Sequence, residues 1–324
     1  MVNQVNRVNL VNRPAVLMLR ALGLGDFLTG VPAYRALRAA HPEHETVLAA
    51  PSALAPLARL CGAIDRLLPT GELAPIEWAG PPPDVGVDLH GNGPASHEPV
   101  AATGARTLMV YASEAAPHEK GPWWDDDEHE VSRWCRLLEW WDIPADPRDL
   151  LLDPPEVPAP AEGAVVVHPG AASGSRRWPA DRYAAVARAL TDMGERVVVT
   201  GSGRERPLAH EVAERAGLSA DAVLAGRTGL AELAALVSRA RLVVSNDTGM
   251  AHLGFAYARP SVTLYGPVSP ALWGPPDKPQ HAVLWHGAGG RPGDAWGAVP
   301  DPRLLRITVE EVVDAARRVL PQPT

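Results

Sequence analysis

The stretch on which the fold depends spans residues 240–252 and reads Ala-Arg-Leu-Val-Val-Ser-Asn-Asp-Thr-Gly-Met-Ala-His. Its first half is short and apolar, which is typical of a buried strand in a parallel sheet. Residues 250–258 have the composition of a helix, and the Arg259-Pro260 pair after them ends it. The stretch is therefore predicted to be a strand-to-helix turn.

This turn has the features of a phosphate site. Asp247 or Thr248 can cap the new helix. The N–H groups at its start, with Gly249 permitting close approach, suit a phosphate. His252 lies one turn further and is expected to face the same opening. Taken alone, however, the turn is more typical of a capped helix with a packed histidine, so its interpretation depends on the other loops.

Apolar strands alternate with helices along the whole chain, which predicts parallel α/β sheets. We expect a disordered or extended segment at 1–13, a Rossmann-like domain at 14–152, a Pro-rich linker at 153–162 and a second Rossmann-like domain at 163–306. A C-terminal helix within 307–324 is expected to pack toward the first domain. The expected strands are 15–19, 46–50, 84–89, 106–110, 164–167, 196–200, 222–224, 242–244 and 261–264.

Composition narrows the possible functions. No apolar run approaches the ~20 residues of a membrane span, residues 1–13 lack the apolar stretch of a signal peptide, and two cysteines do not suggest a disulfide framework. We therefore expect a cytoplasmic protein. Residues 1–152 hold 12 Lys and Arg against 20 Asp and Glu, whereas residues 153–324 hold 18 of each. The first half carries the whole net charge of −8, which argues against nucleic acid as a partner.

The first glycine-rich turn, Gly23-Leu24-Gly25-Asp26, follows the strand at 15–19. A dinucleotide site would need a third glycine where Leu28 stands and an acid at the end of the second strand, which instead ends in Ala50-Pro51. A plain turn with a helix cap is the simplest interpretation. Asp26 nevertheless lies at the carboxyl end of a parallel strand, where it can accept a proton from a substrate hydroxyl.

Two loops of the second half have the composition of nucleotide sites. Residues 168–179 read His-Pro-Gly-Ala-Ala-Ser-Gly-Ser-Arg-Arg-Trp-Pro, and the adjacent Arg176 and Arg177 suit a diphosphate because guanidinium groups match phosphate oxygens. The alternative is a solvated basic loop. We favour a ligand because this loop and the one at Asp247 leave the same edge of one sheet. Thr200-Gly201-Ser202-Gly203 is either part of a nucleotide site or a plain turn.

The acidic run Asp125-Asp126-Asp127 lies in an irregular loop at 111–130, beside Trp123 and Trp124. Carboxylates that precede a helix favour its dipole, so we expect no metal site there. No Cys/His spacing suggests zinc, and no G-x-S-x-G motif indicates a serine nucleophile.

Taken together, these segments resemble glycosyltransferase family 9, the family of the ADP-heptose:lipopolysaccharide heptosyltransferases. The resemblance covers residues from about 15 to 320. The segments that carry it are, in order, Arg20-Ala21-Leu22-Gly23-Leu24-Gly25-Asp26, His168-Pro169-Gly170 with Arg176-Arg177-Trp178-Pro179, Asn246-Asp247-Thr248-Gly249-Met250-Ala251-His252, and Leu264-Tyr265-Gly266-Pro267 with Trp273-Gly274-Pro275.

The resemblance implies a GT-B fold, in which two doubly wound Rossmann-like domains face each other across a cleft. The first domain would bind the acceptor and the second an ADP-linked sugar. The transfer would invert the configuration and would require neither a metal nor a further cofactor. Asp26 matches the family's proposed general base, and Arg176 replaces a lysine that commonly binds phosphate. The donor residues expected are Gly170, Ser175, Arg176, Arg177, Gly201, Asp247, Thr248, Gly249 and His252.

The acceptor is predicted from the acidic first half. Tryptophan rings stack on sugars and carboxylates attract ammonium groups, so a cationic amino-sugar or aminocyclitol of natural product biosynthesis fits Gly25, Trp123, Trp124 and Asp125. A lipopolysaccharide core or other cell-envelope acceptor is the alternative. Two other activities stay open, a nucleotide-sugar 2-epimerase and a non-catalytic nucleotide-sugar binding protein.

Overall fold

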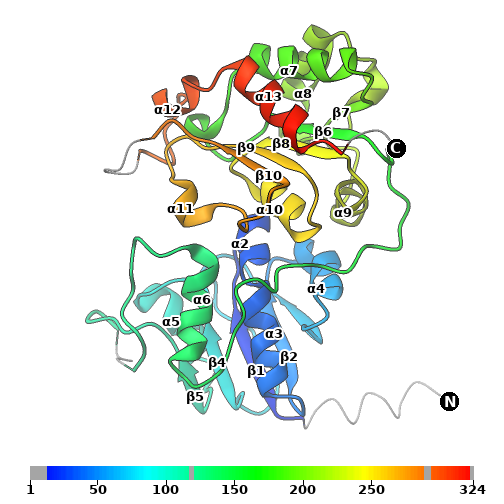
Figure 1. Cartoon of the computed structure of the whole chain (residues 1–324). Coiled ribbons are helices and arrows are strands. Elements are labelled where there is room, and N and C mark those ends of the chain that lie inside the picture. Colours follow the sequence, from blue (N-terminus) through cyan, green and yellow to red (C-terminus); the bar gives the residue numbers. More distant parts are fainter. Residues whose placement is uncertain (1–12, 117–119, 288–292, 322–324) are drawn as a thin grey trace, which may run out of the picture. The chain divides into compact units, whose positions relative to one another are not determined.

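The computed structural model describes residues 13–116, 120–287 and 293–321. Of the N-terminal segment 1–13, only Arg13 lies within these residues. The chain divides into two compact units, Met1–Leu150 and Leu151–Thr324, whose elements are labelled in Figure 1. Among the described helices, none has both the length and the apolar character needed to cross a membrane.

The first unit contains a five-stranded parallel sheet in the order β3-β2-β1-β4-β5. The chain adds β2 and β3 on one side of β1 and then crosses to the other side for β4 and β5. All five residues of β1 are buried, as expected for a central strand covered on both faces. The strands are β1 (Ala15–Leu19), β2 (Glu45–Ala50), β3 (Arg66–Pro69), β4 (Val85–Asp88) and β5 (Thr107–Met109).

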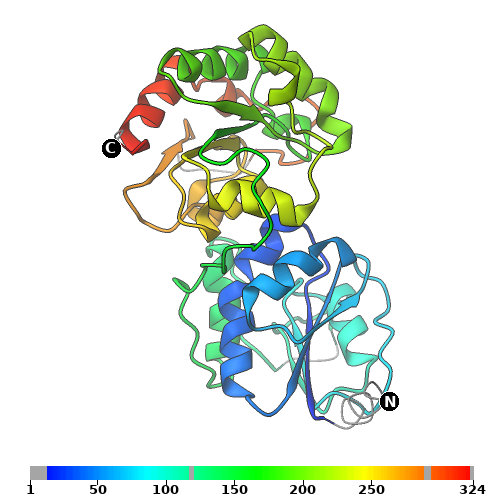
Figure 2. The same ribbon diagram turned by 90° about the vertical axis from the view of Figure 1, so that its right-hand side faces the viewer.

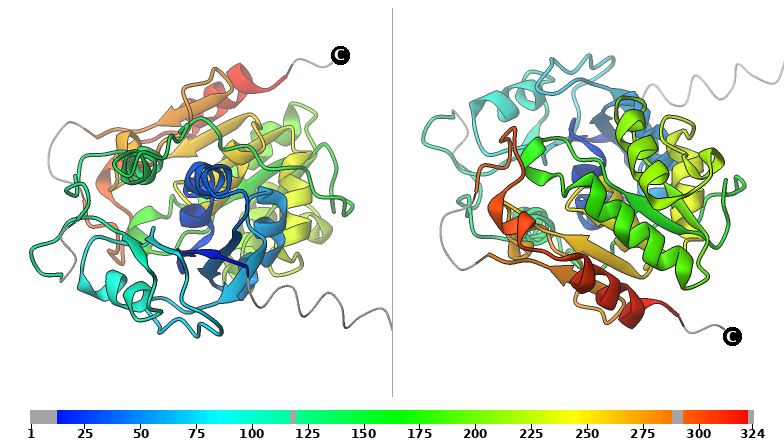
Figure 3. Two further views of the ribbon diagram at one scale, coloured as in Figure 1. Left: turned by 90° about the horizontal axis from the view of Figure 1, so that it is seen from below. Right: turned by 90° about the horizontal axis from the view of Figure 1, so that it is seen from above.

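Helices cover both faces of this sheet. Figure 3 shows α3 and α6 on one face and α5 on the other. Two helices follow β1, because Gly30 ends the first and Pro32, which lacks an N–H, lies in the first turn of the second. Strand β3 and helix α5 were not predicted from the sequence. The helices are α2 (Leu24–Thr29), α3 (Val31–Ala40), α4 (Ala55–Cys61), α5 (Pro94–Ala101) and α6 (Glu130–Glu139), with a 3₁₀ turn η1 (Ser52–Leu54) before α4.

The second unit contains another five-stranded parallel sheet, in the order β10-β9-β8-β6-β7. Its winding changes direction between β6 and β8. Two doubly wound parallel sheets confirm the predicted α/β fold class. The strands are β6 (Val165–His168), β7 (Val197–Val199), β8 (Leu242–Asn246), β9 (Ser261–Leu264) and β10 (His281–Leu284).

Figure 2 shows α7, α8 and α13 on one face of the second sheet and α9 and α10 on the other. The helices are α7 (Ala180–Asp192), α8 (Arg206–Ala216), α9 (Leu230–Ser238), α10 (Gly249–Ala256), α11 (Pro270–Trp273), α12 (Pro302–Leu305) and α13 (Val309–Val319), with 3₁₀ turns η2 (Gly174–Arg176), η3 (Gly203–Glu205) and η4 (Ala220–Ala222).

The strands of the second unit require two corrections. The strand expected at 222–224 is wrong, because η4 occupies its start and only one bridge joins Val223 to Val199. Strand β10 was missed, because the Pro- and Gly-rich loops around it obscure its short apolar run. The apolar face of α13 is buried in the core of the second unit, against α7 and β8–β10, and its expected packing toward the first domain stays a prediction.

Candidate functional site

The carboxyl ends of β1 and β4 form the first candidate site, because the winding of the first sheet reverses between these strands. Ligands of open α/β sheets bind at such switch points. The turn after β1 brings Arg20 and Asp26 to this edge, and β4 ends there at Asp88. The N–H of Ala21 donates to Nδ1 of His90 at 3.2 Å, which joins the turns that follow the two strands.

Asp26 is the third residue of α2 and combines capping with accessibility. Its Oδ2 accepts a hydrogen bond from the N–H of Gly23 at 3.2 Å, and its side chain is 30% exposed. Burial raises the pKa of Asp26, while the nearby charge of Arg20 lowers it. Asp26 thus caps the start of α2, as the simplest interpretation of the turn predicts, and its partly exposed carboxylate lies at the switch point. Gly25 precedes it in the same helix and is half-buried.

Asp88 is a further residue of this edge, which was not predicted from the sequence. Its side chain is fully buried, its Oδ1 accepts from the N–H of His90 at 2.8 Å, and its Oδ2 lies 3.7 Å from Nε2 of His97. Burial raises the pKa of Asp88 to about 7. The available signal was its position at the carboxyl end of the predicted strand 84–89, the same criterion that selected Asp26.

The two tryptophans of the acidic loop differ in environment. Trp123 is 63% exposed. Trp124 packs edge-on against Tyr111 and Trp134, and the Arg133 guanidinium stacks on its ring at 4.0 Å. Trp123 thus has exposed ring surface, whereas Trp124 holds the loop against α6.

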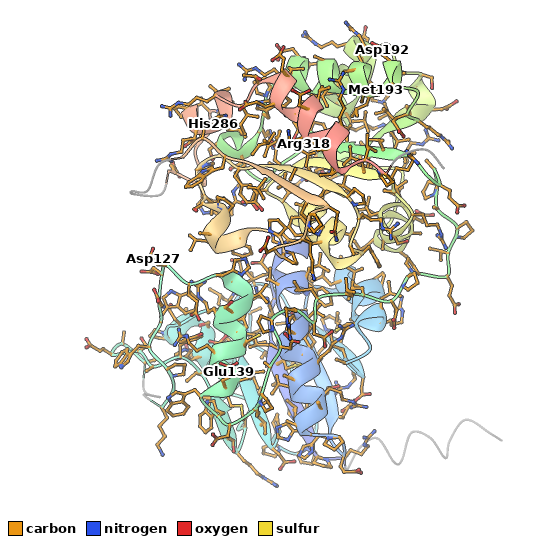
Figure 4. The ribbon with its side chains drawn as sticks, viewed as in Figure 1. Asp127, Glu139, Asp192, Met193, His286 and Arg318 are labelled. Atoms are coloured by element: carbon orange, nitrogen blue, oxygen red, sulfur yellow. The ribbon has the colours of Figure 1, made fainter. Side chains whose placement is uncertain are left out.

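The carboxylates of residues 125–130 also separate into two groups. Glu128 pairs with Arg136 at 2.7 Å, and Glu130 pairs with Arg20 and Arg133. The side chains of the other group accept hydrogen bonds only from N–H groups or extend into solvent. Within the described residues, none of them is ion-paired. Figure 4 labels Asp127 at the loop before α6 and Glu139 at the opposite end of that helix. The members of this second, exposed group are Asp125, Asp126 and Asp127.

The second candidate site lies at the carboxyl ends of β6 and β8, the switch point of the second sheet. Asn246, fully buried at the end of β8, joins the two loops. Its Nδ2 donates to the carbonyls of Pro169 and Gly170 at 3.1 and 3.2 Å, and its Oδ1 accepts from the N–H of Trp178 at 3.2 Å. The loop after β6 is therefore held directly against the strand that leads into α10.

Helix α10 begins beside Asn246. Thr248 is its cap, with Oγ1 accepting from the N–H of Met250 at 3.3 Å, which decides between the two predicted caps. Gly249 is the first helical residue, and a helix leaves its first N–H groups without intrahelical partners. His252 is buried, 4.0 Å from Oδ1 of Asp247, and its ring packs edge-on against Trp273. Its packing matches the simpler prediction for this residue.

The two adjacent arginines are used differently. Arg177 is exposed and donates from Nε and Nη2 to the carbonyl of Ala171 at 3.0 and 2.8 Å, so its guanidinium holds the loop. Arg176 is half-buried, and its buried Nε has no hydrogen-bond partner among the described residues. A buried guanidinium nitrogen without an acceptor is unfavourable, which indicates a place for an anionic ligand.

The hydroxyl and the N–H of Ser175 already have hydrogen-bond partners within the protein. Its hydroxyl lies 3.0 Å from that of Ser173, and its N–H donates to the carbonyl of Gly297 at 2.8 Å. An added Cβ at Gly174 would lie 1.9 Å from the carbonyl oxygen of Ala298, so glycine is required for this close approach. Ser175 thus joins the loop to residues 294–301.

The loop after β7 reaches the same edge. The ring of His168 lies 3.0 Å from the Thr200 hydroxyl, and burial lowers the pKa of this histidine. A Cβ at Gly170 would lie 2.2 Å from a carboxylate oxygen of Glu205, which itself accepts from the N–H of Ser202 at 2.8 Å. Gly201, next to Ser202, lies in this loop. The structure therefore brings the predicted donor residues to one edge, after β6, β7 and β8.

Known proteins resemble this chain in sequence and in fold. Residues 117–289, more than half of the chain, match the sequence family described as "Glycosyltransferase family 9 (heptosyltransferase)". The chain is similar to lipopolysaccharide heptosyltransferase 2 of Escherichia coli (strain K12), with 38% identity over 106 residues. This match covers 32% of the chain and 30% of the relative, so the chain spans about a third of the length of that relative.

Two solved structures share the fold over nearly the whole chain. They are the glycosyl transferase family 9 protein from Veillonella parvula DSM 2008, with a TM-score of 0.76 and 19% identity, and the E. coli ADP-heptose lps heptosyltransferase II, with a TM-score of 0.73 and 22% identity. Each comparison covers 94% of this chain, and 97% and 98% of the respective structures. The fold is therefore GT-B, with two Rossmann-like units.

Proposed function

Because the chain belongs to glycosyltransferase family 9, we propose that it transfers a heptose from ADP-heptose to an acceptor hydroxyl. The observation that carries the proposal is Arg176, whose buried Nε has no protein partner, on a loop that Asn246 clamps beside the start of α10. A diphosphate supplies the anion that this group lacks. The ADP-heptose named for the E. coli structural neighbour provides a donor of this chemistry.

In the proposed reaction, Asp26 removes the proton from the acceptor hydroxyl, and the hydroxyl oxygen attacks the anomeric carbon of the donor. The bond from that carbon to the diphosphate breaks in the same step, so the configuration inverts. The departing charge is stabilised by Arg176 and by the N–H groups of Thr248 and Gly249 at the start of α10. Preorganised cationic and N–H donors of this kind can replace a metal, so we propose metal-independent transfer.

The acceptor we favour is a cationic amino-sugar or aminocyclitol. Pairing with arginines neutralises Glu128 and Glu130, which leaves Asp125, Asp126 and Asp127 as the exposed acidic group beside Trp123. A protonated amine is attracted by these carboxylates, and the exposed indole offers a stacking face for a sugar ring. The second candidate acceptor is a lipopolysaccharide core, favoured by the names of the curated relatives.

The test of the activity is incubation with ADP-heptose, an aminoglycoside and a lipopolysaccharide core acceptor, followed by mass spectrometry. A glycoside formed together with ADP supports the proposal. An isomerised donor would instead identify a 2-epimerase. An unchanged donor that nevertheless binds would indicate a non-catalytic nucleotide-sugar binding protein.

The test of the acceptor is a charge substitution. Asp125→Asn, Asp126→Asn and Asp127→Asn combined should raise KM for the aminoglycoside, as should added salt, because exposed charges are screened beyond about 10 Å at 0.1 M. Glu139→Gln is the matched control for Asp127→Asn. Each substitution removes one exposed charge, and the two residues lie at opposite ends of α6 (Figure 4). Transfer to the phosphorylated lipid acceptor alone, without use of aminoglycosides, would refute the cationic acceptor.

A further inference from the structure

The first unit contains a buried arginine that the proposed reaction does not use. Arg20 follows β1 and is fully buried, which is rare for a charged side chain without partners. Its guanidinium donates to the carbonyls of Asp26 and Leu89, and from Nη2 to Oγ1 of Thr29 and Oε1 of Glu130, both at 2.9 Å. These four acceptors come from α2, α6 and the turn after β4.

Glu130 completes the cluster from the start of α6. Its side chain is 7% exposed and accepts from Arg20, from Nη1 of Arg133 at 2.6 Å and from Nε1 of Trp134 at 2.8 Å. The Trp134 ring lies 4.8 Å from the Arg20 guanidinium. Arg133 also donates to the carbonyls of residues 125 and 128. One connected network therefore links the turn that carries Asp26 with the acidic loop.

We propose that the buried Arg20–Glu130 pair is a positioning unit that holds Asp26 for proton transfer and controls the charge of its carboxylate. This inference rests on the proposed function, in which Asp26 is the general base. Arg20 and Glu130 touch no substrate in it and act only through Asp26.

The geometry of Asp26 supports this role. Thr29 relays the contact with Arg20, because its hydroxyl also donates to the Asp26 carbonyl at 2.9 Å. The Gly23 N–H binds Oδ2, whereas Oδ1 lies 3.9 Å from Nη2 of Arg20, beyond hydrogen-bond distance. Arg20 and Thr29 thus hold the backbone carbonyl of Asp26 through hydrogen bonds. Oδ1 of Asp26 lies near the Arg20 guanidinium but receives no hydrogen bond from it.

The two members of the pair act on Asp26 with opposite sign. Burial raises the pKa of Asp26, the Arg20 charge lowers it, and the Glu130 charge raises it. The Arg20 charge thus favours the ionised form that a base requires at neutral pH. A purely structural role does not require charges, since buried ion pairs are often replaceable by apolar residues.

Three other titratable groups lie around this cluster. Burial raises the pKa of Tyr34 on α3, and burial together with the Arg20 charge lowers that of His90 after β4. The Tyr34 side chain therefore stays neutral at neutral pH and below, and the lowered pKa of His90 leaves its ring uncharged at neutral pH. Burial raises the pKa of Asp88 to about 7, and the Asp88→Asn variant identifies its signal.

The test follows the Asp26 carboxyl carbon by NMR in the full chain labelled at the aspartate carboxyl groups, with Asp26→Asn assigning the signal. In Arg20→Gln, the titration should move up by about one pH unit, because a cation within 4–6 Å is lost. In Glu130→Gln, it should move down. Arg66→Gln is the control, because it removes an ion pair with Glu45 at the amino end of the same sheet and should leave Asp26 unchanged.

A second measurement separates positioning from charge. Arg20→Lys keeps the cation but cannot reach all four acceptors, so its Asp26 titration should stay near that of the wild type. Its kcat should fall on the order of 10- to 100-fold, with KM for ADP-heptose unchanged, as expected for a misplaced base. If Arg20→Gln does not fold, Glu130→Gln and Arg20→Lys test whether the Arg20–Glu130 pair positions Asp26 and controls its charge.

Opposite shifts in Arg20→Gln and Glu130→Gln support the proposal. Shifts in the same direction, or no shift in either folded variant, would overturn it and leave a structural cluster only. The titration requires no turnover, so a wild-type protein without transfer activity would refute the proposed function while the role of the pair is still decided by NMR.

Discussion

Replacing Arg176 with alanine should weaken ADP binding far more than replacing Arg177, although the two residues are adjacent and equally charged. Arg176 has a buried Nε without a protein partner, whereas Arg177 already donates twice to the carbonyl of Ala171. A hydrogen bond to a charged group contributes roughly 1.5–3 kcal/mol. At 1.4 kcal/mol per tenfold, Arg176→Ala should raise the Kd for ADP by about 10- to 150-fold.

Calorimetric titration of each folded variant with ADP measures this difference. Arg177→Ala is the matched control and should change Kd by less than about threefold, while lowering the free energy of unfolding by about 1 kcal/mol through the lost loop contacts. Arg176→Lys should fall between wild type and alanine, because lysine keeps the charge but loses the planar fork. Equal affinity of Arg176→Ala and wild type, or an equal loss in both alanine variants, would refute the assignment.

Three further outcomes are expected. Asp26→Asn should reduce transfer by about 10²–10⁴-fold with ADP affinity preserved, and full turnover by the folded variant would remove Asp26 as the base. Asn246→Ala should lower the free energy of unfolding by about 2–4 kcal/mol, from three lost hydrogen bonds at roughly 0.5–1.5 kcal/mol each, and should weaken ADP binding; denaturant unfolding that is unchanged would contradict the clamp. Transfer should persist in EDTA, and an activity that disappears there and returns with Mg²⁺ would show that a metal is required.

Much of the fold was predictable because parallel strands are buried on both faces and appear as short apolar runs. The strand ends followed from these runs, and with them the positions of Asp26, Arg176 and Thr248. Strand order was not predictable, because it depends on which crossovers the chain takes. Only the order β3-β2-β1-β4-β5 reveals that the turns after β1 and β4 meet at a switch point, and so makes Asp88 a neighbour of that site.

The roles of individual side chains were harder to predict, because they depend on partners distant in sequence. Arg20 looks like an exposed residue of a glycine turn, and its burial depends on Glu130, 110 residues away. Trp123 and Trp124 are equivalent in the sequence, yet one is exposed and the other packs against Tyr111. Arg176 and Arg177 differ in burial and in partners, because the guanidinium of Arg177 is exposed and donates to the carbonyl of Ala171, whereas that of Arg176 is half-buried.

In the proposed reaction, a single displacement with Asp26 as base inverts the anomeric configuration. The most direct test of this displacement is proton NMR of the reaction of ADP-heptose with whichever acceptor the enzyme uses, following the anomeric proton of the transferred sugar. A single displacement gives a product whose anomeric configuration is opposite to that of the donor, formed in step with ADP. Retention of the donor configuration would contradict it, because retention requires two displacements or a different geometry of attack.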